Sequence, residues 1–282
     1  MSTRQVDVAR VSDAVEELFL RANTVLRKDV TKALKDLYEK EQKPLPKKML
    51  GVLLENRDIA EKKNIPICQD TGVAVVFLKV GRSVAFTGGE LMDAVDAGVR
   101  RAYEKGGLRK SVVEDPVLRG NTGTNTPAFV HAEIVPGDKI GITAMPKGFG
   151  SENKSVLCML DPTSGEDAIT DLCVESVRST GPDACPPYVL GVGIGATADL
   201  CCLLAKKALL RDVDSSNPAQ HLGRLEQAIK EEVNRLGIGV MGLGGISTVM
   251  GVNIEAAPTH IAGLPVAINL SCHALRSADM VI

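Results

Sequence analysis

The chain of 282 residues contains no tryptophan, and aromatic residues make up only 3% of it. Proteins that bind single-stranded nucleic acid stack bases on aromatic side chains, so this scarcity argues against such a partner. The 33 lysines and arginines nearly balance 35 aspartates and glutamates, which gives a formal net charge of −2 with no block of either sign. This balance also argues against nucleic acid and an anionic membrane surface as partners, although a small anionic substrate remains compatible with it.

The sequence also lacks long apolar runs. None reaches the length needed to cross a bilayer, and the first 17 residues lack the apolar stretch of a signal peptide. We therefore expect a cytoplasmic protein, in which thiols stay reduced. Its seven cysteines are odd in number and irregular in spacing, which argues against a disulfide framework.

What is present is an ordinary globular composition, with 44% hydrophobic and 24% charged residues. We expect a single domain over residues 1–282, in which a helical region of about 1–63 precedes a region of about 64–282 that carries the candidate site. Helices and strands occur in separate runs along the sequence. This arrangement favours an α+β fold with a mixed or antiparallel sheet flanked by helices.

Local signals predict the individual elements. Three N-terminal helices are expected from helical spacing, with Ser12, Asp29 and Pro46 at or near their starts. Residues 128–135 and 139–146 are expected to form a β-hairpin across the turn residues Pro-Gly-Asp. The remaining expected elements are a strand over 73–80, a helix over 90–104, a helix over 165–180, a strand, turn and helix over 189–210, a charged helix from about 216, and two or three closing strands.

The segment NIPICQDTG, residues 64–72, holds the densest group of reactive side chains. Cys68, Gln69, Asp70 and Thr71 follow one another between a predicted helix and a predicted strand. Pro66 disfavours helix there, and loops between regular elements commonly carry chemistry. Taken alone, the segment is equally compatible with a polar turn that contains an incidental cysteine.

The cysteines divide by context. Four lie among apolar residues and are expected to pack in the core, namely Cys158, Cys173, Cys201 and Cys202. Cys68, Cys185 and Cys272 instead lie at predicted loop edges, where a thiol can face a cleft. Three thiolates from distant loops could hold an iron–sulfur cluster, although their spacing matches no local metal motif and zinc is the simpler choice on spacing alone.

Two glycine-containing loops attract attention as possible anion sites. KGFGSENKS, residues 147–155, offers backbone N–H groups together with Lys147 and Lys154. GVGIGATADL, residues 191–200, resembles a phosphate-binding turn, but it lacks the complete glycine spacing and the lysine of known motifs. Glycines that allow close backbone packing are therefore the favoured interpretation of the second loop.

Polar and charged residues outside these loops offer further candidates. The loop RGNTGTNTP, residues 119–127, contains more local hydrogen-bonding side chains than a plain connector needs. Arg109 and Arg119 could each bind a carboxylate through two hydrogen bonds, or each could be a solvated surface charge. His260 lies in a predicted loop and His273 adjoins a cysteine, although a lone histidine is more often structural than catalytic.

Five motifs together resemble class I fumarate hydratase and, equally, the alpha subunit of the related L-tartrate dehydratase. They are IPICQDTG, RGNTGTNTPA, KGFGSENKS, CPPYVLGVGIGATAD and PTHIAGLPVAINLSCHALR, in this order along the chain. The resemblance extends from about residue 10 to the end of the sequence. It implies the N-terminal catalytic domain of this family.

The resemblance also implies roles for individual residues. Cys68, Cys185 and Cys272 would be the three protein ligands of a [4Fe-4S] cluster whose fourth iron binds substrate. The other implied contacts surround the dicarboxylate, and they come from Gln69, Asp70, Arg109, Gly150 and His260. Asp70 would also belong to the proton-transfer pair, and Arg119 is the second choice to Arg109.

The resemblance finally implies an activity and a partner. The reaction would be the reversible hydration of fumarate to L-malate, a step of the tricarboxylic acid cycle, and dehydration of L-tartrate to oxaloacetate is the alternative. Single-chain members continue into a second domain with a catalytic threonine, so a separate beta subunit is expected to supply it here, in an alpha–beta heterodimer or a dimer of that unit. A non-catalytic iron–sulfur sensor and a nucleotide-binding enzyme are less favoured, because neither a basic output domain nor a complete phosphate motif is present.

Overall fold

The computed structural model describes residues 3–282 and has the predicted α+β class, with helices packed on mixed sheets. The chain forms two compact units that interleave in sequence. Unit 1 comprises the described residues up to Arg27, together with Arg57–Phe149 and Arg276–Ile282. Unit 2 comprises Lys28–Asn56 and Gly150–Leu275. The expected helical region of about 1–63 is thus divided between the units, and a single domain over 1–282 stays a prediction.

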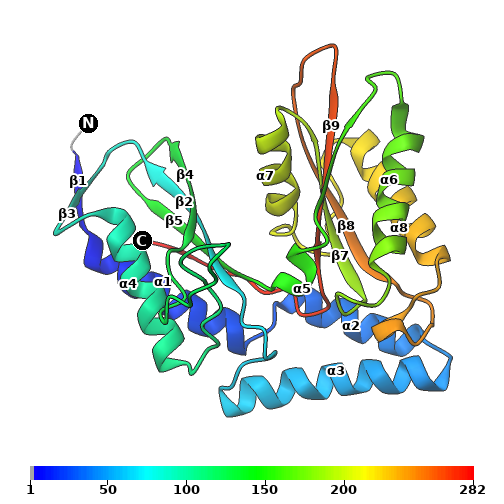
Figure 1. Ribbon diagram of the computed structural model, residues 1–282, viewed down its shortest axis with the longest axis horizontal. Helices are drawn as coiled ribbons and strands as arrows, with labels where there is room; N and C mark the ends of the chain where they lie inside the picture. The colour runs from blue at the N-terminus through cyan, green and yellow to red at the C-terminus, as the bar shows by residue number, and fades with distance from the viewer. Residues whose placement is uncertain (1–2) are drawn as a thin grey trace. The chain divides into compact units, whose positions relative to one another are not determined.

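Unit 1 is built on a four-stranded sheet of order β10–β5–β2–β4, on which α1 packs alongside α4 (Figure 1). Its elements are β1 (Arg4–Asp7), α1 (Val8–Thr24), β2 (Val73–Gly81), β3 (Val84–Thr87), α4 (Leu91–Lys105), β4 (Phe129–Val135), β5 (Ile140–Lys147) and β10 (Ala278–Val281). The core between the sheet and the helices is apolar and includes Val15, Leu18, Val76 and Ile142.

The hairpin predicted from residues 128–135 and 139–146 is wrong. Both segments are strands, β4 and β5, but β2 lies between them, parallel to β4 and antiparallel to β5. The physical reason is burial, because residues Val73–Leu78 of β2 are buried without interruption whereas β4 is mostly exposed or half-buried. A strand that is apolar on both faces takes the interior of the sheet, and β4 is left at its edge.

The N-terminal helical region is confirmed as α1, α2 (Lys28–Lys40) and α3 (Pro44–Lys63), with the short strand β1 before them. Two of the residues expected to cap these helices, Ser12 and Asp29, do not cap them. Asp7 caps α1 by accepting a hydrogen bond of 2.9 Å from the Ala9 N–H, while Ser12 is buried inside the helix. Asp29 is also inside its helix, where its carboxylate accepts the Val213 N–H at 2.9 Å.

Unit 2 is a second sheet, of order β6–β9–β7–β8, with α7 against β7 and β9 and with α8 against β8 (Figure 1). The strand β6 was not anticipated from the sequence. The elements are α5 (Phe149–Glu152), β6 (Val156–Leu160), α6 (Gly165–Thr180), β7 (Tyr188–Gly195), α7 (Ala198–Ala208), α8 (Gln220–Arg235), a 3-10 turn (Val240–Gly242), β8 (Val249–Ala257) and β9 (Leu264–Ser271).

The glycines of β7 confirm the interpretation that GVGIGATADL serves close packing. A Cβ atom on Gly191 would lie 2.1 Å from the Ala205 carbonyl oxygen, and one on Gly193 would lie 2.1 Å from the Cys201 carbonyl oxygen. Both oxygens belong to the backbone of α7, which cannot retreat without leaving the sheet. The glycines therefore set how closely α7 approaches β7.

Gly193→Ala should lower the free energy of unfolding by about 2 kcal/mol, because the added methyl group forces α7 away from the sheet. Gly263→Ala is the matched control, since a Cβ at that position meets nothing within 4 Å. Chemical denaturation of the two variants measures the difference. Equal stabilities would show that the helix–sheet distance does not depend on Gly193.

Among residues 3–282, no helix is both long and apolar enough to cross a membrane. None of the seven cysteines, all of which lie within the described residues, forms a disulfide.

Candidate active site

The segment 64–72 forms an irregular loop that leads from α3 into β2, as the sequence predicts. The Ile67 N–H donates to the Asn23 carbonyl oxygen at 2.9 Å, which ties the start of the loop to the end of α1. At the other end, Gly72 has a φ of +74° and its α-carbon approaches the backbone of Lys147 so closely that a Cβ would lie 2.7 Å away. Only glycine fits this exit from the loop.

Asp70 is half-buried, and backbone groups fix its carboxylate on both sides. Its Oδ1 accepts a hydrogen bond of 3.0 Å from the Gly72 N–H, and its Oδ2 accepts one of 2.9 Å from the Phe149 N–H. Phe149 begins the short helix α5, so the loop with Asp70 and the KGFG segment meet at this carboxylate. Two donors from different segments leave the side chain little freedom to rotate.

Arg276 holds the same loop from the protein interior, and sequence reasoning missed it. Only 3% of this side chain is exposed. Its Nη2 donates to the Asp70 carbonyl oxygen at 2.7 Å, and its Nη1 donates to the Asn23 Oδ1 at 3.0 Å. A buried guanidinium that donates to a backbone carbonyl and to a side-chain amide oxygen positions Asp70 rather than meeting solvent.

Arg276→Met should lower the free energy of unfolding by about 2 kcal/mol, because two buried acceptors lose their donors while the volume is kept. Arg276→Lys should lose less, since an ammonium can still reach one acceptor. Arg10→Met, at an exposed position in α1, is the surface control. An unchanged urea midpoint in Arg276→Met would remove Arg276 as a support of the loop.

Thr71 links the loop to Arg109. Its Oγ1 accepts the Arg109 N–H at 2.9 Å and lies 3.2 Å from the Arg109 carbonyl oxygen. Tyr103, buried in α4, places its hydroxyl 2.9 Å from the carbonyl oxygens of both Thr71 and Gly72, and burial raises the pKa of this tyrosine. The hydroxyl of Thr71 thus fixes the backbone beside Asp70.

Asn125 ties the polar loop 119–127 into the same network. Its Nδ2 donates to the Gly72 carbonyl oxygen at 3.2 Å, and its Oδ1 accepts the Ser111 N–H at 2.7 Å. The residue is fully buried and has a φ of +61°, a conformation that asparagine tolerates better than most residues. The hydrogen-bonding capacity of this loop is therefore used in part to hold the segment around Asp70.

Cys68, Gln69 and Arg109 line one open pocket of about 320 Å³ in unit 1. The Cys68 thiol is half-buried, and its Sγ lies 3.4 Å from the Gln69 Oε1. The Arg109 side chain is exposed and has no hydrogen-bond or ion-pair partner among residues 3–282. Arg119 lies ten residues further along the exposed loop and does not line this pocket. Of the two arginines, Arg109 is the one beside Cys68 and Gln69.

Cys185 and Cys272 are neighbours in unit 2. Cys272 follows β9, and the next residue, His273, donates its backbone N–H to the Cys185 carbonyl oxygen at 3.2 Å. Val189 of β7 pairs with Ser271 of β9, so both cysteines lie at the same end of the sheet. Both thiols are half-buried.

The backbone of Cys185 is strained. Its φ is +59°, in the left-handed region that costs a residue other than glycine roughly 1–2 kcal/mol. Tyr188 supports the turn, since its hydroxyl donates to the Gly181 carbonyl oxygen at 2.6 Å and accepts the Ala184 N–H at 3.3 Å. These two hydrogen bonds hold the turn in its strained conformation.

His260 is not brought near these two cysteines. It is exposed in the loop between β8 and β9, where its Nδ1 accepts the Ala262 N–H at 3.1 Å. Cys272 lies at the other end of β9, and eight strand residues span roughly 26 Å. Gly150 follows Phe149 in α5, and no atom lies within 4 Å of a Cβ built on it.

The remaining candidates have mixed outcomes. Cys173 and Cys201 are buried as expected, but Cys202 is exposed and Cys158 is half-buried, so the core interpretation is wrong for Cys202. Cys201 packs with Ala205 and Ala267, whereas Cys202 lines an open pocket beside β6 and β9. Lys147 is almost fully buried and Lys154 pairs with Asp183 at 3.2 Å, so the two lysines do not form an exposed anion cradle.

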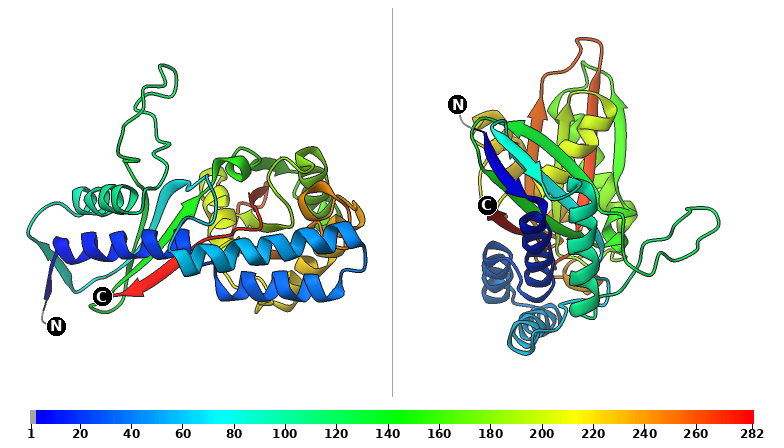
Figure 2. Two further views of the ribbon diagram at one scale, coloured as in Figure 1. Left: turned by 90° about the horizontal axis from the view of Figure 1, so that it is seen from below. Right: turned by 90° about the vertical axis from the view of Figure 1, so that its left-hand side faces the viewer.

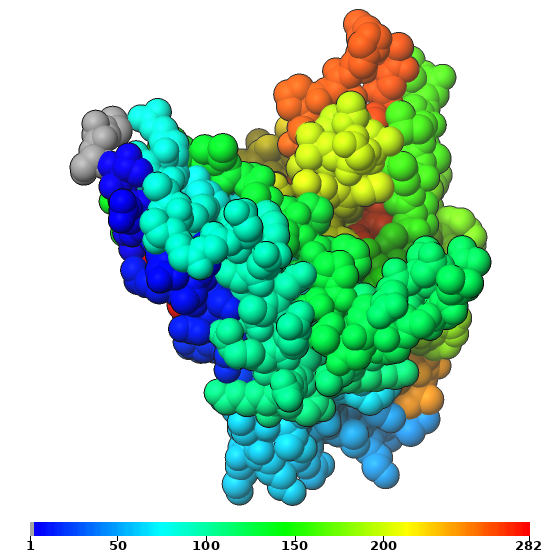
Figure 3. All heavy atoms as spheres, turned by 60° about the vertical axis from the view of Figure 1, so that its left-hand side comes forward, coloured from blue at the N-terminus to red at the C-terminus, as the bar shows by residue number. Residues whose placement is uncertain are grey.

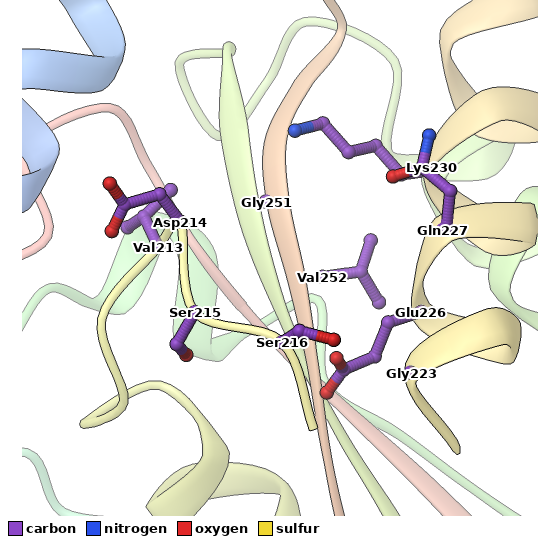
Figure 4. Close-up of a pocket in the computed structure, with 10 residues that line it drawn as sticks. All are labelled: Val213, Asp214, Ser215, Ser216, Gly223, Glu226, Gln227, Lys230, Gly251 and Val252. Carbon is purple, nitrogen blue, oxygen red and sulfur yellow. The ribbon is translucent and has the colours of Figure 1, made fainter. Parts of the chain in front are cut away.

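Another pocket of unit 2, of about 200 Å³, contains none of the predicted site residues. In Figure 4, Gln227 and Lys230 reach it from α8, while Asp214, Ser215 and Ser216 approach from the loop after α7. The pocket mixes carboxylate and ammonium groups, with Asp214 paired to Lys32. Because charges of both signs line it, the pocket does not favour a substrate of either charge.

The donor chemistry fits an iron–sulfur cluster, because three thiols outside any disulfide lie at loop edges and two of them adjoin each other at a strained turn. Within residues 3–282, however, no three histidine, cysteine, aspartate or glutamate side chains gather as a metal-binding group. Cys185 and Cys272 are neighbours within unit 2, whereas Cys68 belongs to unit 1.

Comparison with known proteins identifies one family. The sequence matches the profile described as fumarate hydratase (fumerase) over residues 12–281. It is 42% identical over 278 residues to the putative L(+)-tartrate dehydratase subunit alpha of Methanocaldococcus jannaschii, with 95% of this chain and 96% of that protein covered. It is 33% identical over 285 residues to the L(+)-tartrate dehydratase subunit alpha of Escherichia coli strain K12, with 100% of this chain and 93% of that protein covered.

Proposed function

Since the chain belongs to the fumarate hydratase family, we propose that it is the alpha subunit of a two-subunit hydro-lyase that acts on a small hydroxylated dicarboxylate. The comparisons support a lyase of this family. The names of the relatives, which are alpha subunits, favour a separate beta subunit as the partner.

Dehydration of L-tartrate is the favoured reaction, and hydration of fumarate to L-malate is the second candidate. The similar proteins described above carry the tartrate name, at 42% and 33% identity. The two substrates differ by one hydroxyl group. Discrimination against a substrate that lacks this hydroxyl depends on buried groups that pair with it, and a partner subunit would supply part of them.

The proposed cofactor is a [4Fe-4S] cluster held by the thiolates of Cys68, Cys185 and Cys272. When bound, it would supply a Lewis-acidic iron with an open position for the substrate's hydroxyl and adjoining carboxylate. The strained turn at Cys185 and the adjacent Cys272 support this donor set.

The residues of this chain would orient the substrate and move its carbon-bound proton. Arg109, exposed and without a protein partner, is suited to hold a carboxylate through two hydrogen bonds. Asp70 would exchange the proton on the carbon next to a carboxylate, with its oxygens held by the Gly72 and Phe149 N–H groups. For tartrate, loss of this proton from one carbon and of hydroxide from the next gives the enol of oxaloacetate and water. Gln69 and Gly150 stay proposed contacts to the dicarboxylate, whereas His260 lies at the other end of β9 from Cys272 and is left out of this set.

The observation that carries the proposal is that Cys68, Gln69 and the unpaired Arg109 line one pocket. The residue after Gln69 is Asp70, whose carboxylate is held by two backbone N–H groups. In this arrangement the thiol would hold the metal, the guanidinium and the amide would bind the dicarboxylate, and the fixed carboxylate would move the proton.

Reconstitution tests the proposal. The chain is loaded anaerobically with iron and sulfide, mixed with the beta chain sought in the adjacent reading frame, and assayed with L-tartrate, fumarate and L-malate in parallel. We expect oxaloacetate from tartrate only when both chains are present. Preference for fumarate would select the second reaction, full turnover by this chain alone would remove the partner, and inactivity of the complex on all three substrates would refute the proposal.

A further inference from the structure

One segment of unit 1 has no role in the proposed function, although it adjoins the candidate site. Residues 112–122, called the arm here, run out from the base formed by Ser111 and Asn125 and return to it. In both views of Figure 2 the arm projects away from the helices and strands of its unit, and Figure 3 shows it on the face turned to the viewer. Residues 114–121 are all exposed.

The arm is ordered by its own backbone in spite of this exposure. Val113 and Asn121 form an antiparallel bridge, and the Glu114 N–H donates to the Gly120 carbonyl oxygen at 2.7 Å. The Thr122 N–H donates to the Val112 carbonyl oxygen at 3.0 Å. Its two sides are therefore held together as a short ribbon.

The tip of the arm is fixed by Asp115. Its Oδ1 accepts the N–H groups of Val117 at 2.7 Å and Leu118 at 2.6 Å, and these bonds lower the pKa of the carboxyl. The Arg119 N–H donates back to the Asp115 carbonyl oxygen at 2.9 Å, with a φ of +65° at Arg119. The turn is thus preformed, which reduces the ordering entropy that binding would cost.

This rigid turn presents two adjacent apolar side chains to water. Val117 is 83% exposed and Leu118 is 85% exposed. Single exposed apolar residues are common on protein surfaces, but here two lie side by side on a preformed, projecting turn, so that one partner could bury both. Charged Asp115 and Arg119 flank the pair, as polar residues flank the apolar centre of an interface.

We propose that the arm is a docking element for the beta subunit, with Val117 and Leu118 inserted into an apolar pocket of that subunit. The inference rests on the proposed two-subunit function. The base of the arm favours the beta subunit as the partner, because hydrogen bonds connect it to the candidate site. The Ser111 N–H donates to Asn125, and the Asn125 amide donates to the Gly72 carbonyl oxygen, two residues from Asp70. A subunit that grips the arm is held next to the site to which it must contribute residues.

The experiment measures the dissociation constant of the alpha–beta complex by sedimentation, with iron-loaded wild-type alpha and the double variant Val117→Asp/Leu118→Asp. We expect the double variant to bind at least tenfold more weakly, because burial of two carboxylates in an apolar pocket is unfavourable. At saturating beta chain its KM for substrate should equal the wild-type value, since neither residue touches substrate. Ile134→Asp is the matched control in the same unit, because Ile134 is also 83% exposed but lies on the edge strand β4.

The outcomes separate the inference from the function on which it rests. Equal dissociation constants for the wild type and the double variant would overturn the docking role of the arm and leave the two-subunit function intact. A double variant that loses association between alpha copies, and retains the beta chain, would also overturn it by assigning the arm to a second copy. No complex between wild-type alpha and the beta chain would overturn both proposals.

Discussion

Asp70→Asn should lower kcat of the alpha–beta complex by about 10²–10⁴-fold, the range over which a positioned acid or base acts. The substituted amide has nearly the same shape as the carboxylate but cannot accept a proton from carbon. It also turns one acceptor into a donor, so one of the bonds from Gly72 and Phe149 is lost, at a cost of about 1 kcal/mol in stability. Steady-state kinetics and urea denaturation measure the two effects separately.

Asp161→Asn provides the matched control for this prediction. Asp161 is an exposed carboxylate whose Oδ1 likewise accepts from a turn, at 2.9 Å from the Thr163 N–H and 2.6 Å from the Thr163 hydroxyl. It lies outside the candidate site, so its loss should alter stability slightly and leave kcat unchanged. Iron content should be normal in both variants. Turnover of Asp70→Asn within threefold of wild type would exclude Asp70 from proton transfer.

Much of the fold follows from local sequence signals, because helix spacing, capping residues and glycines act over a few residues. The glycines of β7 are an example, since their close approach to α7 was expected and is found. The order of strands depends instead on interactions between distant segments. The position of β2 between β4 and β5 follows from its burial on both faces, which neighbouring turn residues do not reveal.

The candidate site was only partly predictable for a related reason. Reactive side chains are recognisable in sequence, and the structure places Cys68, Gln69 and Arg109 on one pocket. The residues that hold them have no such signature. From the sequence, Arg276 would be taken for a surface charge, yet only 3% of it is exposed. Tyr103 would be taken for one more apolar position of an amphipathic helix.

Cys272→Ser should abolish iron binding after anaerobic reconstitution with iron and sulfide. Wild-type protein should bind about four iron ions per chain and turn brown, as three-thiolate ligation of a cubane cluster implies. A serine hydroxyl remains protonated near neutral pH and does not replace a thiolate, so the variant should stay nearly colourless. Cys202→Ser, at an exposed thiol outside the ligand set, is the control and should load normally. Normal iron content in Cys272→Ser would refute the ligand assignment independently of any activity assay.

Cys185→Asn sharpens this test by separating stability from ligation. Asparagine occupies the left-handed backbone region more readily than cysteine, and the φ of Cys185 is +59°. If the turn served folding alone, the variant would be at least as stable as wild type and would still take up iron. If the strain persists because a thiolate is needed there, the variant should unfold at an equal or higher urea concentration and yet lose its iron. Retention of about four iron ions per chain in Cys185→Asn would assign the strained turn to folding and remove Cys185 from the ligands.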